Sequence, residues 1–167
     1  MNKVSVAFIG MGYRGKQLFR LLRNIPFFQI LAVADPGVEP SELPDISCYN
    51  HGENSSLEML EKHHPELVFI ASPWQYHVQH ALLCVEHGCH VALEVKGGLC
   101  LDEYAPLIES AERRGCHVYP LENTLFTREN LAVFNMVNEG LLGEIVFMRG
   151  GYCLLYTSPS PRDRSLS

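Results

Sequence analysis

Short apolar runs alternate with longer amphipathic segments along most of the chain. The apolar runs are rich in β-branched residues and end beside glycine, proline or polar residues, which is typical of strands buried on both faces of a sheet. We expect five such strands, at Lys3–Ile9, Phe28–Ala34, Leu67–Ala71, His90–Leu93 and His117–Leu121. Apolar residues at helical spacing predict helices between them, at Tyr13–Asn24, Leu57–His64, Gln75–His87 and Leu101–Arg114.

Strands that alternate with helices predict a parallel sheet covered on both faces. With right-handed crossovers, the fold class is α/β, a Rossmann-like doubly wound parallel sheet. The segment between Pro36 and Ser56 holds three prolines and several polar residues, and we expect a surface loop there with at most one short element. This first domain is expected to span residues 1–122.

The pattern changes after the fifth strand. Arg128–Asn138 has the spacing of one more amphipathic helix, and Glu144–Met148 predicts a strand with no partner in the first sheet. We therefore interpret residues 123–152 as the first elements of a second α/β domain, truncated here. Residues 153–167 are rich in serine, proline and arginine, and "CLLYTSPSPRD" resembles a translated sequencing-library adapter, so we interpret them as a non-native tail.

Composition and charge narrow the class of protein. The 167 residues carry a formal net charge of −6, which argues against a nucleic-acid partner. No run of 18 apolar residues predicts a membrane span. The N-terminal apolar run leads into glycines and a charged helix rather than a cleavage site, so we expect a cytoplasmic protein. The six cysteines form no CxxC pair and lie mostly in apolar segments, which predicts free thiols.

A complete GxGxxG motif follows the first strand and opens the first helix. It consists of Gly10, Met11, Gly12, Tyr13, Arg14 and Gly15. Gly10 permits the tight turn, Gly12 lets the backbone approach a pyrophosphate, and Gly15 lets the helix pack closely on the strand. The helix N-terminus offers free N–H groups and partial positive charge to phosphates. The motif therefore predicts a dinucleotide site.

The end of the second strand indicates which dinucleotide is bound. Asp35 lies 20 residues beyond Gly15, where a carboxylate accepts hydrogen bonds from the hydroxyls of the adenosine ribose. A carboxylate there repels a 2′-phosphate, so NAD is predicted as cofactor in preference to NADP. Arg14 keeps NADP as an alternative, because a nearby arginine can accommodate that phosphate.

Three more strand ends border the same crevice, because ligands of open α/β sheets bind beyond the carboxyl ends of the strands. Ser72 and Pro73 follow the third strand, and His77 is either a cofactor contact or a structural residue in the first turn of a helix. Lys96 follows the fourth strand, as a proton donor or acceptor at the nicotinamide or as a surface lysine paired with Glu94. After the fifth strand, Asn123 faces the crevice or caps a helix.

The histidines at 77, 80, 87 and 90 match no metal-ligand pattern, so no metal is predicted.

Five stretches in this order resemble the N-terminal part of the Gfo/Idh/MocA oxidoreductases, the glucose-fructose oxidoreductase and inositol dehydrogenase group. They are "VAFIGMGYRG", "AVADP", "IASPWQYHVQHA", "HGCHVALEVKGG" and "GLLGEIVFMRGGY", and the resemblance covers residues 3 to about 152. Relatives have a TPxxxH-like segment in place of the third stretch. They usually show Glu-Lys-Pro where this chain has Glu94-Val95-Lys96-Gly97, so Lys96 takes the catalytic position only if the turn accommodates an extra residue.

The resemblance implies an NAD-binding domain followed by an α/β domain that supplies most substrate contacts and associates into homo-oligomers. It implies phosphate contacts around the three glycines of the motif and a ribose contact at Asp35. It also implies nicotinamide-side contacts near Ser72, Pro73, His77, Glu94 and Lys96. The substrate expected for the whole enzyme is a sugar or polyol, oxidised by hydride transfer to the cofactor. The chain by itself is expected to bind the dinucleotide and to turn over nothing.

Two other functions stay open. The stretches "LENTLFTRENLAVFNMVNEGLLGEIVFMRGGY" and "EVKGG" are similar to a branch of NAD-dependent glycosidases that cleave N-acetylgalactosamine. Those enzymes oxidise a sugar hydroxyl transiently, eliminate the glycosidic substituent, add water and return the hydride. The remaining alternative is a noncatalytic NAD-binding protein.

Overall fold

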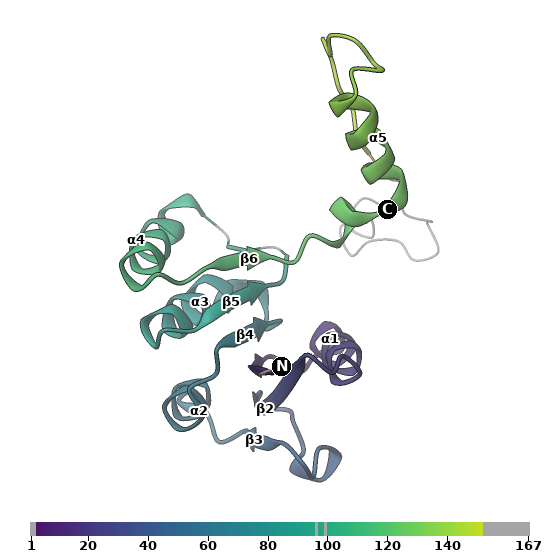
Figure 1. Ribbon diagram of the computed structural model, residues 1–167. Coiled ribbons are helices and arrows are strands. Elements are labelled where there is room, and N and C mark those ends of the chain that lie inside the picture. The colour runs from purple at the N-terminus through teal and green to yellow at the C-terminus, as the bar shows by residue number, and fades with distance from the viewer. Residues whose placement is uncertain (1–2, 96, 99, 152–167) are drawn as a thin grey trace, which may run out of the picture. The chain divides into compact units, whose positions relative to one another are not determined.

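Six parallel strands form one sheet in the order β3-β2-β1-β4-β5-β6 in the computed structural model, which describes residues 3–95, 97–98 and 100–151 (Figure 1). The strands are β1 Val4–Ile9, β2 Phe28–Ala34, β3 Ser47–Tyr49, β4 Leu67–Ile70, β5 His90–Leu93 and β6 Val118–Pro120. The order reverses between β1 and β4, the switch point at which open α/β sheets bind ligands. The predicted Rossmann-like fold class is confirmed.

The helices cover both faces of this sheet. They are α1 Tyr13–Arg23, α2 Ser55–His63, α3 His77–Glu86 and α4 Tyr104–Arg114, with α5 Arg128–Asn138 farther along the chain. Helix α1 lies on one face, and α2, α3 and α4 lie on the other (Figure 1). Short 3₁₀ turns are η1 Pro40–Glu42, η2 Trp74–Tyr76, η3 Leu101–Glu103 and η4 Asn123–Phe126.

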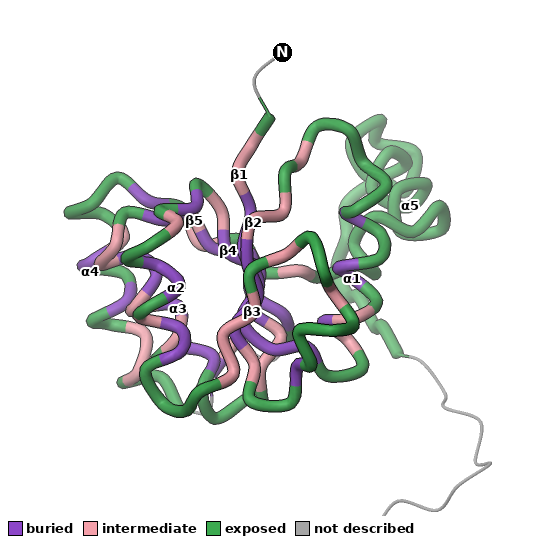
Figure 2. The backbone as a smooth tube through the Cα atoms, turned by 90° about the horizontal axis from the view of Figure 1, so that it is seen from below, coloured by how far each residue is buried: buried purple, intermediate pink, exposed green. Residues whose placement is uncertain are grey.

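Alternate residues of β1 supply the two hydrophobic cores. Val6 and Phe8 pack toward α1, whereas Ala7 and Ile9 pack toward the opposite helices, and all four are at most 2% exposed. Burial is concentrated along the central strands, while the outer helix surfaces are exposed (Figure 2). A strand buried on both faces explains why the apolar run is continuous rather than alternating with polar residues.

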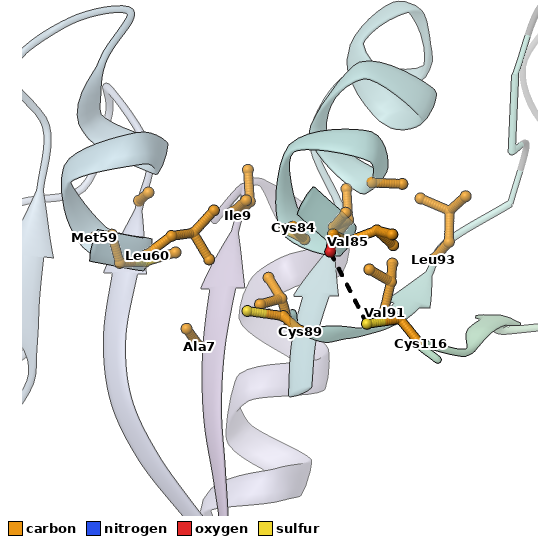
Figure 3. Close-up of a cluster of buried hydrophobic side chains, with 14 of the residues drawn as sticks. Ala7, Ile9, Met59, Leu60, Cys84, Val85, Cys89, Val91, Leu93 and Cys116 are labelled. Carbon is orange, nitrogen blue, oxygen red and sulfur yellow. Dashed lines mark hydrogen bonds between the residues drawn. The ribbon is translucent and has the colours of Figure 1, made fainter. Parts of the chain in front are cut away.

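Three of the cysteines belong to the core beneath α2, α3 and α4 (Figure 3). Cys84, Cys89 and Cys116 are buried free thiols, and Cys48 is a half-buried one. Burial raises the pKa of Cys89 to about 11, so this thiol stays protonated and acts as a small apolar side chain. The expectation of free thiols is confirmed for the five described cysteines, although Cys100 is exposed, and Cys153 lies outside the described residues.

Two expectations about local structure need correction. The segment from Pro36 to Ser56 contains both η1 and a sixth strand, because β3 pairs with β2 and so obtains its hydrogen bonds from a neighbour distant in sequence. The segment Glu144–Met148 forms no strand, and its apolar residues are exposed. A strand is stable only beside a partner, and no described segment pairs with this one.

The chain divides into two compact units, the first ending at Glu122 and the second beginning at Asn123. In the second unit, Thr127 caps α5, because its Oγ1 accepts a hydrogen bond from the backbone N–H of Asn130 at 3.4 Å. The tail expected at 153–167 lies outside the described residues. Among the helices that the structure describes, none has the length and apolar character needed to cross a membrane.

Candidate cofactor site

The turn between β1 and α1 requires glycine at its first position. Gly10 has a φ of +94°, a conformation that L side chains rarely adopt. A Cβ at Gly10 would overlap the backbone N of Ser72 and lie 2.7 Å from the carbonyl oxygen of Ala71. The backbone N–H of Gly10 donates to the carbonyl of Ala34 at 2.9 Å. The ends of β1, β2 and β4 therefore meet closely at this glycine.

Helix α1 also requires glycine where it packs on the turn. Gly15 is buried in the first turns of the helix, and a Cβ there would collide with the carbonyl oxygen of Gly10. The absence of a side chain brings the helix N-terminus directly over the strand end, as the motif predicts.

Gly12 differs from Gly10 and Gly15, because no neighbouring protein atom excludes a side chain there. A Cβ at Gly12 would have nothing within 4 Å, and its φ of −63° suits any residue. Packing therefore does not demand glycine here, and the open space beside its backbone is what an approaching pyrophosphate needs. The first backbone N–H groups of α1 have no acceptor within the helix and are available to an anion. The residues present thus fit a dinucleotide.

Asp35 is fixed at the end of β2 by two backbone groups. Its Oδ2 accepts a hydrogen bond from the N–H of Met11 at 2.6 Å, and its Oδ1 accepts one from the N–H of Gly37 at 2.7 Å. Each carboxylate oxygen retains a lone pair for a further donor, such as a ribose hydroxyl. The carboxylate is therefore oriented before any ligand binds, and it stabilises the glycine-rich turn itself.

A cleft of about 510 Å³ lies beyond the carboxyl ends of β1, β2 and β4. Its lining residues are Gly12, Asp35, Ala71, Ser72, Pro73, Trp74 and Gln75. A larger cavity of about 810 Å³ lies between α4 and β6, and none of its lining residues belongs to the glycine-rich turn. The smaller cleft is the one that holds the predicted dinucleotide contacts Gly12 and Asp35.

Two histidines of the following helix anchor the loop after β4. His77 is 1% exposed, and its Nε2 lies 2.6 Å from the carbonyl oxygen of Ser72. His80 Nδ1 lies 2.9 Å from Ser72 Oγ, and burial lowers the pKa of His80 with a further contribution from His77. The structural interpretation of His77 matches this geometry, and its contact with a cofactor stays a prediction. Pro73 lines the same cleft.

Arg14 and Glu94 form an ion pair at the carboxyl edge of the sheet. Arg14 Nε donates to Glu94 Oε1 at 2.7 Å, and the Glu94 side chain is 8% exposed against 38% for Arg14. Asp35 and Glu94 follow β2 and β5, which lie three strand spacings apart, or about 14 Å. Arg14 is thus held on the side of the site away from Asp35, which weakens the argument for NADP. Arg14 and Glu94 are 80 positions apart in the chain, so no local sequence pattern predicts that they pair.

The two partners of this ion pair should respond differently to substitution. Arg14→Leu should lower the free energy of unfolding by about 1–3 kcal/mol, because it leaves the buried Glu94 carboxylate without a cation. Glu94→Gln should lower it by less than about 1 kcal/mol, because the amide oxygen still accepts a hydrogen bond and half-exposed Arg14 remains hydrated. Urea unfolding of both variants measures the difference, and equal losses would contradict it.

The remaining predicted residues fall into three groups. Tyr13 is 83% exposed at the start of α1, and Met11 is 5% exposed beneath the turn. Asn123 begins η4 in the second unit, so its cofactor contact stays a prediction. Lys96 lies outside the described residues, and its catalytic role also stays a prediction. Trp74 and Gln75 line the cleft but were not singled out, although the loop that carries them was.

The four histidines considered as metal ligands all have other neighbours. His87 Nδ1 lies 2.8 Å from the carbonyl oxygen of Leu83, and His90 Nδ1 accepts from the N–H of His117 at 3.0 Å. Within the described ranges, no group of three or more His, Cys, Asp or Glu side chains has the arrangement of a metal site.

The fold and the site together define a dinucleotide-binding Rossmann domain. Residues 4–120 match the family model of the Gfo/Idh/MocA proteins, an oxidoreductase family with an NAD-binding Rossmann fold. The chain belongs to this family. The resemblance seen in the motifs is therefore confirmed, as is the NAD-binding class of cofactor.

The chain is also similar to individual curated and solved proteins. It is 33% identical over 162 residues to glycosyl hydrolase family 109 protein 1 of Bacteroides fragilis, a match that covers 91% of this chain and 35% of the relative. The chain thus spans about a third of the length of that relative. Myo-inositol 2-dehydrogenase from Lactobacillus plantarum superposes with a TM-score of 0.75 at 18% identity, covering 87% of this chain and 44% of that one.

A third similar protein is the WlbA dehydrogenase from Bordetella pertussis, solved in complex with NADH and UDP-GlcNAcA. Its TM-score is 0.74 at 14% identity, and the match covers 85% of this chain and 44% of that one. At these identities, the two solved structures support the fold alone.

Proposed function

We propose that this chain binds NAD and forms the cofactor-binding part of an enzyme that exchanges a hydride with a sugar or polyol. The observation that carries the proposal is the placement of Asp35 and Gly12 in one cleft. The oriented carboxylate accepts hydrogen bonds from the ribose hydroxyls, and the open space beside the Gly12 backbone accommodates the pyrophosphate. When bound, NAD supplies the hydride acceptor.

Three features of the chain favour NAD over NADP. The Asp35 carboxylate would lie close to a 2′-phosphate and repel it. Both of its oxygens are held by backbone N–H groups, so the carboxylate cannot easily turn away. The guanidinium of Arg14, the cation of the glycine-rich motif, is paired with Glu94 at the far side of the site.

The contribution of Asp35 is measurable with the chain itself. Asp35→Ala should weaken NAD binding about 10- to 100-fold, because hydrogen bonds to a charged group contribute about 1.5–3 kcal/mol each. The same variant should bind NAD and NADP with similar affinity, because the repulsion of the 2′-phosphate is gone. Calorimetric titration measures both effects. Asp45→Ala is the matched control, since the Asp45 side chain is 81% exposed and lies outside the cleft.

The role of the chain in catalysis is to bind and orient the cofactor. Its glycine-rich turn holds the pyrophosphate and Asp35 holds the adenosine ribose, while the loop after β4 forms a fixed wall of the cleft. The curated relative is about three times as long as the match, so we propose that most of the substrate-binding region, with its acid/base groups, lies in the part that this chain does not span. Residues 123–152 are proposed as the first part of that region.

A glycoside hydrolase is the second candidate function. It is favoured by the curated relatives, since the Bacteroides fragilis protein at 33% identity is named as a glycosyl hydrolase. Both candidates need the same NAD site, because transient oxidation and net oxidation begin with the same hydride transfer. They differ in whether the hydride returns.

One assay of a protein that joins these residues to a substrate-binding region distinguishes the two functions. Net oxidation of a sugar or polyol accumulates NADH in proportion to product. A glycosidase releases N-acetylgalactosamine from a glycoside, requires NAD and accumulates no NADH. A protein that binds NAD but does neither would instead be a noncatalytic NAD-binding protein.

The proposal includes a reducing, cytoplasmic location and self-association. The five described cysteines support the first part, since all are free thiols and at least three are buried in the core. Size-exclusion chromatography coupled to light scattering tests the second part.

A further inference from the structure

We propose that Trp74 is the stacking surface for the adenine base of the dinucleotide, an inference that rests on the proposed NAD site. Trp74 lines the cleft together with Asp35 and Gly12, and 58% of its surface is exposed. An indole that a domain leaves in water beside a polar recognition site offers a flat apolar face to a planar ligand. NAD has two planar rings that could stack on it, the adenine and the nicotinamide.

The loop holds this indole in place before a ligand arrives. Pro73 has a φ of −57°, and its carbonyl accepts the N–H of Tyr76 at 2.9 Å, which closes the 3₁₀ turn that carries Trp74. One residue earlier, Ser72 is anchored through its carbonyl by His77 and through its hydroxyl by His80. A side chain on a fixed turn loses little conformational freedom when a base stacks on it.

The contacts behind the turn also support Trp74 as the stacking residue. The ring of Tyr76 packs against that of His80, with centroids 5.9 Å apart, so the residue next but one to Trp74 is fixed against α3. Trp74 itself has no ring partner among the described aromatic pairs. Its neighbours thus support the turn and leave the indole face for a ligand.

The composition of the cleft favours adenine over nicotinamide as the stacked ring, which departs from the nicotinamide-side contacts expected for Ser72 and Pro73 in the same loop. Asp35, which recognises the ribose of the adenosine half, lines the same cleft as Trp74. Glu94 and Val95, at the end of β5, line a different cavity. The loops after β2 and β4 flank the glycine-rich turn on its two sides, so a ribose on Asp35 places its base within the cleft that Trp74 borders.

Two measurements on the 167-residue chain test the assignment. The chain has one tryptophan, so its tryptophan fluorescence reports on Trp74 alone. We expect ADP to change this fluorescence at saturation as NAD does, and nicotinamide mononucleotide to leave it unchanged. Calorimetry of Trp74→Ala should show ADP binding weakened about 5- to 100-fold, the range typical of losing one base–aromatic stack. Trp74→Phe, which keeps an aromatic face, should stay within about threefold of the parent chain.

The outcomes separate this inference from the proposed function. If NAD binds the parent chain but Trp74→Ala binds ADP with unchanged affinity, the stacking assignment is overturned and the NAD site stands. A fluorescence response to nicotinamide mononucleotide and not to ADP also overturns it. Tyr119→Ala, which removes a half-exposed aromatic ring outside the cleft, controls for general loss of aromatic surface, and circular dichroism confirms that each variant is folded.

Discussion

Gly12→Val should abolish measurable NAD binding, weakening it at least about 100-fold, while the chain stays folded. The added side chain occupies the open space beside the Gly12 backbone, which is where the pyrophosphate has to approach. The backbone tolerates the change, because its φ of −63° is ordinary for valine. Valine is a poorer N-cap than glycine, so we expect a stability loss of only about 1 kcal/mol.

A second glycine provides the control for this experiment. A Cβ at Gly150 would likewise have nothing within 4 Å, and its φ is not positive, but this glycine lies in the second unit. Gly150→Val should leave NAD affinity within about twofold of the parent chain, because no ligand group is expected there. Calorimetry and urea unfolding of both variants complete the test. Retained NAD binding in Gly12→Val would contradict the assigned pyrophosphate position.

Gly10→Ala should have the largest effect on stability, a loss of about 3–5 kcal/mol in the free energy of unfolding. Positive φ at a nonglycine residue and overlap with neighbouring backbone each contribute about 1–3 kcal/mol. Here both apply, since the φ is +94° and a Cβ would meet the backbone of Ala71 and Ser72. A loss of this size is a large share of the roughly 5–15 kcal/mol typical of a domain.

Gly52→Ala separates the two causes. Gly52 has a φ of +116° but nothing within 4 Å of a Cβ, so this variant introduces the backbone strain without the overlap. We expect a loss of about 1–2 kcal/mol. Equal losses in the Gly10 and Gly52 variants, measured by urea unfolding, would show that the close approach of β1 and β4 does not restrict residue size.

The fold was predictable because its strands are buried on both faces. A continuous apolar run such as the one ending at Ile9 depends only on its own residues, and the intervening helices have clear spacing. Strand β3 was missed because three residues in a proline-rich segment carry little pattern, and the strand exists through pairing with β2. At Glu144–Met148 the apolar pattern predicts a strand that the structure lacks, because no described segment pairs with these residues.

The site was predictable where its chemistry is local. The glycine spacing and Asp35 belong to one strand–helix–strand unit, so their geometry could be inferred from the motif. The pairing of Arg14 with Glu94 could not, since it depends on how β5 lies against β1 and β4. Trp74 belongs to a loop that was identified, but its exposure in the cleft is a property of the folded turn.

Calorimetric titration of the chain with NAD, and separately with NADP, is the most direct test of the cofactor assignment. The oriented carboxylate of Asp35 and the pairing of Arg14 with Glu94 predict that NAD binds at least about tenfold more tightly than NADP, since charge repulsion at one position changes affinity by roughly a kcal/mol or more. Absence of NAD binding, or equal affinity for the two dinucleotides, would contradict it.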